Sequence, residues 1–338
     1  MKIDEIDYNL PQELIAQYPL KERDKCKLLI YHRDSTKVEH KIFKDIINYL
    51  TPGDVLVFND TKVFSARLYA LKKETSAKLE ILLLKKKSEK EWEALIKPAK
   101  RVKENTIIIV SDKIEVKVIK RIGEGNFLIQ FNKKLTFEEI DKLGKIPLPP
   151  YIKRNLDNDI DKKYYQTIYA KKYGAVAAPT AGFHFTEKLI EKIKNKGVKI
   201  AYITLHISWG TFAPIRTDSI ENHKMHSEYL IITDKNAKII NERKGKCIAV
   251  GTSVVRGLES ASSNGKIFPF QGEVDTYIYP GYKFKVVDSI ITNFHLPKTS
   301  LLLLVSAFIG IEKMKEIYNI AIKQKYRFYS YGDAMMII

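Results

Sequence analysis

The chain has 338 residues, 45% of them hydrophobic, so it can bury a sizeable core, and its length favours two domains. The formal net charge of +18 fits an anionic partner such as RNA, although a lysine-rich composition alone would give the same value. The 2 cysteines form no CxxC pair, which argues against a disulfide framework or a cysteine zinc site and fits the cytoplasm. The longest apolar run, Leu301–Ile311, is too short to span a bilayer, so no membrane segment is expected.

The first part of the chain, residues 1–64, mixes short helices with strands. The sequence predicts strands at Leu28–Tyr31 and Val55–Phe58, and a helix at Phe43–Leu50 between them. From about Arg67 the pattern changes to strand-like runs separated by turn residues, at Leu79–Leu84, Trp92–Ile96, Thr106–Val110, Ile114–Ile119 and Phe127–Phe131. Strands at this spacing favour a small antiparallel barrel or sandwich.

After the barrel-like region the alternation of strands and helices returns. Strand–loop–helix units are expected at Ala175–Lys194, Cys247–Ala261 and Val286–Phe308. Alternating elements of this kind favour a mostly parallel sheet. We therefore expect an α/β fold in which residues 1–64 and 150–338 form one discontinuous catalytic domain and residues 65–149 form an inserted antiparallel β-barrel domain.

Polar residues follow the predicted strands of the α/β part. Because the carboxyl ends of parallel strands meet at one edge of a sheet, we expect these residues to surround one pocket for a small ligand. Imidazoles, a carboxylate and a guanidinium together suit acid–base chemistry. The set comprises Asn59, Asp60, Thr61, Thr180, Gly182, His184, His206, Trp209, Gly210, Thr211, Gly251, Thr252, Ser253, Arg256, Thr292, Asn293 and His295.

Other interpretations of individual motifs are weaker. Each histidine, taken alone, is also consistent with a structural role. His223 and His226 stand three residues apart and precede Glu228, but no thiolate accompanies them, so we expect substrate or phosphate binding there and no metal site. The run Val250–Arg256 lacks the lysine of a P-loop, and no glycine-rich dinucleotide fingerprint is found.

Several blocks, in order along the chain, resemble one enzyme family, the S-adenosylmethionine:tRNA ribosyltransferase-isomerases of queuosine biosynthesis. They include VLVFNDTKV, GKIPLPPYI, GAVAAPTAGFHFT, HKMHSEY, IAVGTSVVRGLES, ITNFHLPKTSLLLLVSAF and YRFYSYGDAM. The departures are small; for example, Lys27 stands where the family usually has arginine. The resemblance implies a two-domain plan of an α/β part with an inserted barrel, in a cytoplasmic monomer.

The resemblance also implies a reaction. The ribosyl moiety of S-adenosylmethionine would be transferred to the aminomethyl group of 7-aminomethyl-7-deazaguanine at the tRNA wobble position and isomerised, giving epoxyqueuosine-tRNA, adenine and methionine. S-adenosylmethionine would be consumed as a substrate, so no resident cofactor is expected. The partners would be S-adenosylmethionine and a tRNA that carries the modified base in its anticodon loop, a single-stranded region whose bases can be splayed out.

This reaction needs a base for the carbon beside the sulfonium, an acid for the departing adenine and a neutral attacking amine. The candidate catalytic residues are His184, Asp60, His206 and His295, of which His184 and Asp60 are the leading two. Positioned acid–base groups of this kind contribute about 10²–10⁴-fold each to the rate.

Other residues suit the parts of S-adenosylmethionine. Arg256 suits the methionine carboxylate, and Asn59 or Thr180 suits the ribose hydroxyls. Trp209 offers an aromatic surface to the sulfonium. The further expected substrate-binding residues are Thr61, Arg67, Gly182, Gly210, Thr211, Glu228, Gly251, Thr252 and Ser253.

Two alternatives stay open on the sequence alone. One is another S-adenosylmethionine-dependent RNA-modifying enzyme, such as a methyltransferase. The other is a non-catalytic RNA-binding module with a barrel platform, which gives no reason for the strand-end histidines. The basic residues of the barrel could grip a tRNA stem or form a solvated surface; they are Lys85–Lys87, Lys97, Lys100, Arg101 and Lys103.

Overall fold

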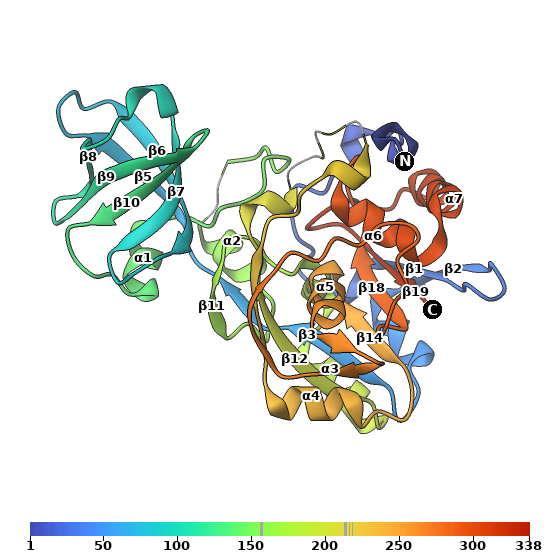
Figure 1. Ribbon diagram of the computed structural model, residues 1–338. Coiled ribbons are helices and arrows are strands. Elements are labelled where there is room, and N and C mark those ends of the chain that lie inside the picture. Colours follow the sequence, from blue (N-terminus) through green and yellow to red (C-terminus); the bar gives the residue numbers. More distant parts are fainter. Residues whose placement is uncertain (156–157, 213–214, 216, 218) are drawn as a thin grey trace.

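A large sheet, built from segments on both sides of the barrel insertion, organises the molecule (Figure 1). The computed structural model describes residues 1–155, 158–212, 215, 217 and 219–338. Within them the sheet has nine strands in the order β17-β13-β12-β3-β14-β18-β19-β1-β2. Their bounds are β1 Lys27–Tyr31, β2 Val38–Ile42, β3 Val55–Asn59, β12 Lys199–His206, β13 Glu228–Ile232, β14 Cys247–Val250, β17 Phe270–Val274, β18 Ser289–Asn293 and β19 Ala334–Ile337.

The sheet is mixed, whereas the sequence favoured a mostly parallel one. The pairs β12–β3, β3–β14, β14–β18 and β19–β1 are parallel. The pairs β17–β13, β13–β12, β18–β19 and β1–β2 are antiparallel. The edge strands β2 and β17 alternate or mix exposed and half-buried residues, so they carry no continuous apolar run that would mark them in the sequence.

Helices cover both faces of the sheet, which is why the central strands β3, β14 and β18 are buried along their whole length. One face packs against α4 (Asp234–Asn241), α5 (Thr252–Ser260), α6 (Ser300–Ile309) and α7 (Ile311–Lys323). The other packs against α3 (Glu187–Asn195) and the 3-10 helix η4 (Phe43–Tyr49). The hydroxyl of Thr186 accepts from the N–H of Leu189, which confirms the predicted start of α3.

The inserted segment forms a closed antiparallel barrel, as expected, and projects to one side of the sheet (Figure 1). Within the described residues its order is β10-β7-β6-β5-β8-β9. The bounds are β5 Arg67–Lys72, β6 Lys78–Lys86, β7 Glu91–Lys97, β8 Ile107–Ser111, β9 Ile114–Gly123 and β10 Asn126–Phe131. The sequence did not distinguish β5, because exposed Tyr69 and Leu71 alternate with its buried residues. The domain boundaries at 64/65 and 149/150 stay a prediction.

Short elements connect the barrel to the sheet. Helix α1 (Phe137–Leu143), capped by Thr136, follows the barrel, and α2 (Asn158–Tyr164) comes later in the connector. Strands β4 (Thr61–Val63) and β11 (Lys172–Ala175) pair in parallel and form a separate small sheet. The remaining elements are η1 Ile3–Ile6, η2 Gln12–Leu14, η3 Arg23–Lys25, η5 Ala99–Arg101, η6 Thr180–His184, η7 Trp209–Phe212, η8 Ile220–Asn222, β15 Ser262–Ser263 and β16 Lys266–Ile267. No helix among the described residues is both long and apolar enough to cross a bilayer.

Candidate functional site

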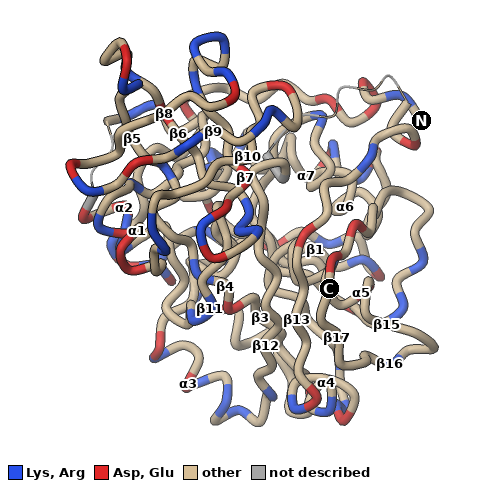
Figure 2. The backbone as a smooth tube through the Cα atoms, turned by 60° about the vertical axis from the view of Figure 1, so that its left-hand side comes forward, with Lys and Arg blue, Asp and Glu red and all other residues tan. Residues whose placement is uncertain are grey.

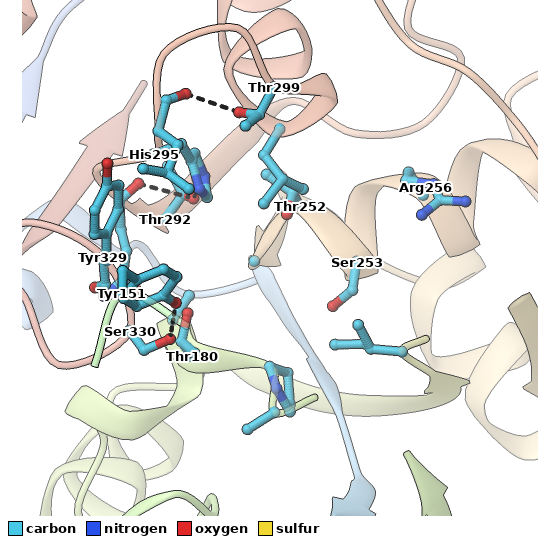
Figure 3. A pocket seen from close by; sticks show the side chains of 18 of the residues that line it. Tyr151, Thr180, Thr252, Ser253, Arg256, Thr292, His295, Thr299, Tyr329 and Ser330 are labelled. Carbon is cyan, nitrogen blue, oxygen red and sulfur yellow. Dashed lines mark hydrogen bonds between the residues drawn. The ribbon is translucent and has the colours of Figure 1, made fainter. Parts of the chain in front are cut away.

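A pocket lies at the carboxyl ends of the neighbouring parallel strands β14 and β18 (Figure 3). Its lining surrounds about 730 Å³ of space that is continuous with the solvent. We call it the strand-end pocket. Its lining residues are Tyr151, Ala178, Pro179, Thr180, Ala181, Ile207, Glu228, Gly251, Thr252, Ser253, Arg256, Thr292, Asn293, His295, Leu296, Thr299, Leu301, Tyr329 and Ser330. The predicted residues Thr180, Glu228, Gly251, Thr252, Ser253, Arg256 and His295 therefore meet here.

The start of α5 forms one side of the strand-end pocket. Gly251 joins β14 to α5 with φ +99°, a conformation that glycine adopts at little cost. No side chain caps this helix, and no described residue accepts from the backbone N–H groups of Thr252 and Ser253. These N–H groups and the helix dipole give this side of the pocket a partial positive charge.

A buried ion pair stands one turn further along α5. Nη1 of Arg256 donates to Oε2 of Glu228 over 2.7 Å, and the two side chains are 5% and 1% exposed. Oε1 of Glu228 also accepts from the N–H of Ser208 over 2.9 Å. Nε of Arg256 donates to the carbonyl of Thr276 over 3.3 Å, whereas its Nη2 has no hydrogen-bond partner among the described residues.

The opposite side of the strand-end pocket carries His295 and two tyrosines (Figure 3). Nε2 of His295 lies 2.8 Å from Oγ1 of Thr292, and burial lowers the pKa of the imidazole to about 3, so the ring is neutral near pH 7. The rings of Tyr151 and Tyr329 lie 4.6 Å apart, and Oη of Tyr151 lies 2.6 Å from Oγ of Ser330. Tyr329 has φ +70°, an uncommon conformation for a bulky residue that here places its ring at the pocket.

His184, which we expected to lead the chemistry, lies behind the strand-end pocket in a small hollow beside Cys26, Arg23 and Arg327. Its Nδ1 lies 3.1 Å from Sγ of Cys26, and its Nε2 lies 3.3 Å from Oδ1 of Asn293. Burial is the main cause that lowers the pKa of His184, to about 4. The hydrogen bond to Asn293 therefore connects His184 to the strand-end pocket, and Ser330 lines both the pocket and the hollow.

Asn59, Asp60 and Thr61 also lie outside the residues that line the strand-end pocket in the described part of the chain. Asn59 is fully buried and joins the ends of two strands, since it bonds both the N–H and the carbonyl of Leu205 over 3.0 and 2.9 Å. Its amide also donates to Oγ of Ser253 over 3.3 Å. Asp60 accepts from the hydroxyl of Thr204 over 2.5 Å, and burial raises the pKa of its carboxyl.

A second hollow, the interdomain cleft, separates the barrel from the sheet. It is lined by Leu84, Lys85, Lys86, Trp92, Phe137, Tyr173, Gly174, His206, Ile207, Ser208, Ser227, Glu228, Tyr229 and Glu273. The rings of His206 and Tyr229 are stacked with an interplanar angle of 10°, and Nδ1 of His206 lies 2.8 Å from Oγ1 of Thr61. Burial lowers the pKa of His206. Ile207 and Glu228 line both the interdomain cleft and the strand-end pocket, so the two spaces share a wall.

The structure places the remaining predicted residues elsewhere. Arg67 and Trp209 line a separate hollow on the barrel with Glu80, to which Nε of Arg67 lies 3.5 Å away. Gly182 and Gly210 serve close packing, because an added Cβ would lie 2.0 Å from Oη of Tyr169 and 2.2 Å from Cδ2 of His226, respectively. The side chain of Thr211 lies outside the described part of the chain.

Sequence reasoning gave no role to several lining residues. Tyr151 lies in the proline-rich connector, and Thr299 is the N-cap of α6. Tyr329 and Ser330 lie in the loop between α7 and β19, so they do not follow a predicted strand and were not among the strand-end residues. The available signal was the block YRFYSYGDAM, which carries the family resemblance but was assigned no function.

Comparison with known proteins gives a consistent result over the whole chain. Residues 3–337 match a protein-family model described as queuosine biosynthesis protein. A relative from Sulfurihydrogenibium sp. (strain YO3AOP1), named S-adenosylmethionine:tRNA ribosyltransferase-isomerase, is 49% identical over 341 residues, covering 100% of both chains. A relative of the same name from Desulforamulus reducens is 48% identical, again over 100% of both chains. The crystal structure of an S-adenosylmethionine tRNA ribosyltransferase from Thermotoga maritima aligns with TM-score 0.55 and 35% identity, covering 99% of this chain and 100% of that one.

Proposed function

This chain belongs to the queuosine biosynthesis protein family, and from that premise we propose that it is an S-adenosylmethionine:tRNA ribosyltransferase-isomerase. It would transfer and isomerise the ribosyl moiety of S-adenosylmethionine onto 7-aminomethyl-7-deazaguanine at the tRNA wobble position, giving epoxyqueuosine-tRNA. Adenine and methionine would be released. The observation that carries the proposal is the wall of Ile207 and Glu228 that the strand-end pocket shares with the interdomain cleft.

The strand-end pocket suits S-adenosylmethionine. It combines aromatic surfaces with hydroxyl groups and a buried guanidinium, which is the mixture typical of small-molecule sites. Tyr151 and Tyr329 offer ring faces to a cation or a flat base, and Thr180 and Thr292 offer hydroxyls to the ribose.

The interdomain cleft suits the RNA base. Of its aromatic lining residues, Trp92 is buried and the Tyr173 ring packs between Phe137 and Lys62, whereas Tyr229 is partly exposed and offers a ring on which an unstacked base can pack. Lys85 and Lys86 stand at the same cleft, and basic residues are spread over both the barrel and the α/β part (Figure 2). The transfer would need the aminomethyl group of a base held there to contact the ribosyl group directly, and Ile207 and Glu228 mark the place where the two spaces adjoin.

We assign acid–base work to His295. It lines the strand-end pocket, and Thr292 holds one of its ring nitrogens at 2.8 Å, which would fix the ring beside a bound substrate. Burial lowers its pKa to about 3, so the ring of the free protein is a neutral imidazole. His206 faces the interdomain cleft and suits proton transfer from the attacking amine. His184 and Asp60 would act from behind the reacting groups, through Asn293 and Thr204.

The test is incubation with S-adenosylmethionine and tRNA that bears 7-aminomethyl-7-deazaguanine, followed by mass analysis of nucleosides and small molecules. The proposal predicts a ribosyl-sized mass increase in the nucleoside together with free adenine and methionine. A methyl-sized increase with S-adenosylhomocysteine would instead identify a methyltransferase. Tight tRNA binding without either product would identify a non-catalytic RNA-binding module.

A further inference from the structure

Nη2 of the Arg256 guanidinium is buried at the strand-end pocket without a hydrogen-bond partner among the described residues. We infer that Nη2 of Arg256, with the hydroxyl of Ser253 and the uncapped start of α5, binds the α-carboxylate of the amino-acid part of S-adenosylmethionine. This inference rests on the proposed function and names the subsite that holds one end of that substrate.

Arg256 is committed on two of its three nitrogen positions. Nη1 pairs with Glu228 and Nε donates to the Thr276 carbonyl, so the orientation of the guanidinium plane is fixed. Nη2 is buried, in a residue only 4% exposed, and no described residue accepts its hydrogens. A buried donor without an acceptor is unfavourable, and a ligand oxygen placed there would remove that cost.

Ser253 supplies a second donor. Because its Oγ accepts from the Asn59 amide over 3.3 Å, the hydroxyl hydrogen remains available for donation. Asn59 is itself fixed by Leu205 on both its amide oxygen and its nitrogen, so the Ser253 hydroxyl is oriented in advance. In Figure 3, Thr252, Ser253 and Arg256 follow one another along the same helix at the side of the pocket.

The main chain adds the third donor. Helix α5 begins at Gly251 without a side-chain cap, and no described residue accepts from the N–H groups of Thr252 and Ser253. These N–H groups favour an anion. Since Glu228 neutralises the formal charge of Arg256, the subsite attracts through directed donors and the helix dipole, which suits one carboxylate with its two oxygens.

The burial of these donors favours a carboxylate over an RNA phosphate as the bound anion. Thr252, Ser253 and Arg256 are 8%, 9% and 4% exposed, respectively. A phosphate in an RNA backbone carries bulky neighbours on both sides and does not fit such a recess, whereas the carboxylate at the end of an amino-acid side arm does. The subsite would therefore distinguish sulfonium nucleosides by whether their amino-acid part carries a carboxylate, a group remote from the reacting ribose.

The experiment compares S-adenosylmethionine with its decarboxylated analogue, which keeps the adenosine, sulfonium and amine. We expect calorimetry on the full-length protein to give a Kd about 10- to 150-fold higher for the analogue, the range for a lost charged hydrogen bond. In Arg256→Gln the two ligands should bind nearly equally. Ser253→Ala should reduce the discrimination in part and leaves the Arg256–Glu228 pair intact, so it serves if Arg256→Gln does not fold. Arg243→Gln, outside the pocket, is the matched control and should keep the full discrimination.

The outcomes separate the two proposals. Equal binding of both ligands by the unaltered protein, or full discrimination retained in Arg256→Gln and in Ser253→Ala, would overturn the carboxylate subsite while S-adenosylmethionine turnover continued. Failure of the unaltered protein to bind S-adenosylmethionine at all would overturn the proposed function and the subsite with it.

Discussion

Nε2 of His184 lies 3.3 Å from Oδ1 of Asn293, so a histidine placed outside the strand-end pocket reaches it through an amide. Nδ2 of Asn293 donates to the carbonyl of Tyr329 over 2.8 Å, which assigns Oδ1 as the acceptor. Nε2 of His184 must then carry the hydrogen, and Nδ1 accepts from the thiol of Cys26 at 3.1 Å. The chain of contacts orients Asn293 and the backbone of Tyr329 at the pocket.

Replacing His184 should therefore lower turnover by changing the position of Asn293 and Tyr329 at the pocket. His184→Gln can still donate to Asn293, whereas His184→Leu leaves the Asn293 oxygen without this donor. We expect a larger loss of kcat in His184→Leu than in His184→Gln, measured as adenine release under saturating substrate. Equal activity of His184→Leu and the unaltered protein, in folded preparations, would remove His184 from the mechanism.

Acid should weaken the fold through the buried histidines. Burial lowers the pKa of His184 to about 4 and that of His295 to about 3, from 6.5 in an unfolded chain. Below about pH 6.5 the unfolded state binds more protons, so the stabilisation present above that pH is lost as the pH falls toward the folded values. Each such histidine contributes a slope of up to about 1.4 kcal/mol per pH unit. Urea unfolding between pH 7 and 4 should show this slope, reduced in His184→Gln; an unchanged slope would contradict it.

Substitution of His295 should act on the chemical step. His295→Gln keeps a polar side chain beside Thr292 but cannot exchange a proton in the same way. We expect kcat to fall by roughly 10²–10⁴-fold with little change in the Kd for S-adenosylmethionine. The control is His32→Gln, which should leave kcat unchanged. His32 forms a partly exposed pair with Glu39 and does not line the strand-end pocket. A fall of less than about threefold in His295→Gln would argue against the acid–base assignment.

Part of this architecture could be predicted because its signals are local in the sequence. The N-cap Thr186 and the apolar face of α3 can be recognised from neighbouring residues, and buried and exposed residues alternate over short stretches in the barrel strands. The meeting of Gly251–Arg256 with His295 follows from the parallel pairing of β14 and β18, which brings their carboxyl ends together.

The rest depends on side-chain direction and on distant segments. Within η6, Thr180 faces the strand-end pocket while His184, four residues later, faces the hollow beside Cys26. A list of strand-end residues cannot tell these directions apart. Tyr151 and Ser330 meet over 2.6 Å although 179 positions separate them, a contact that no local pattern encodes.

The aromatic lining of the interdomain cleft can be tested at Tyr229. Its ring stacks on His206, and we expect Tyr229→Leu to remove a surface for the RNA base. Loss of one base–aromatic stack should raise the KM for tRNA by about 5- to 150-fold. The Kd for S-adenosylmethionine should stay the same. Tyr69→Leu, on the barrel and 49% exposed outside the cleft, is the control. An equal effect of both substitutions on tRNA would contradict a specific base site.

The basic residues of η5, together with the nearby Lys103, test whether the barrel binds RNA. Lys100, Arg101 and Lys103 line a hollow on the barrel together with Lys72. Phosphate contacts release counterions, so binding weakens as salt rises, and each lost contact reduces the slope of log K against log salt by about 1 or slightly less. Replacing Lys100, Arg101 and Lys103 by glutamine should weaken tRNA binding and flatten this slope. Glutamine at Lys188, Lys192 and Lys194 of α3, which are exposed and lie away from the barrel, removes the same three charges as a control. If both sets change the slope equally, net charge alone accounts for binding; a change confined to the barrel set identifies it as a contact surface.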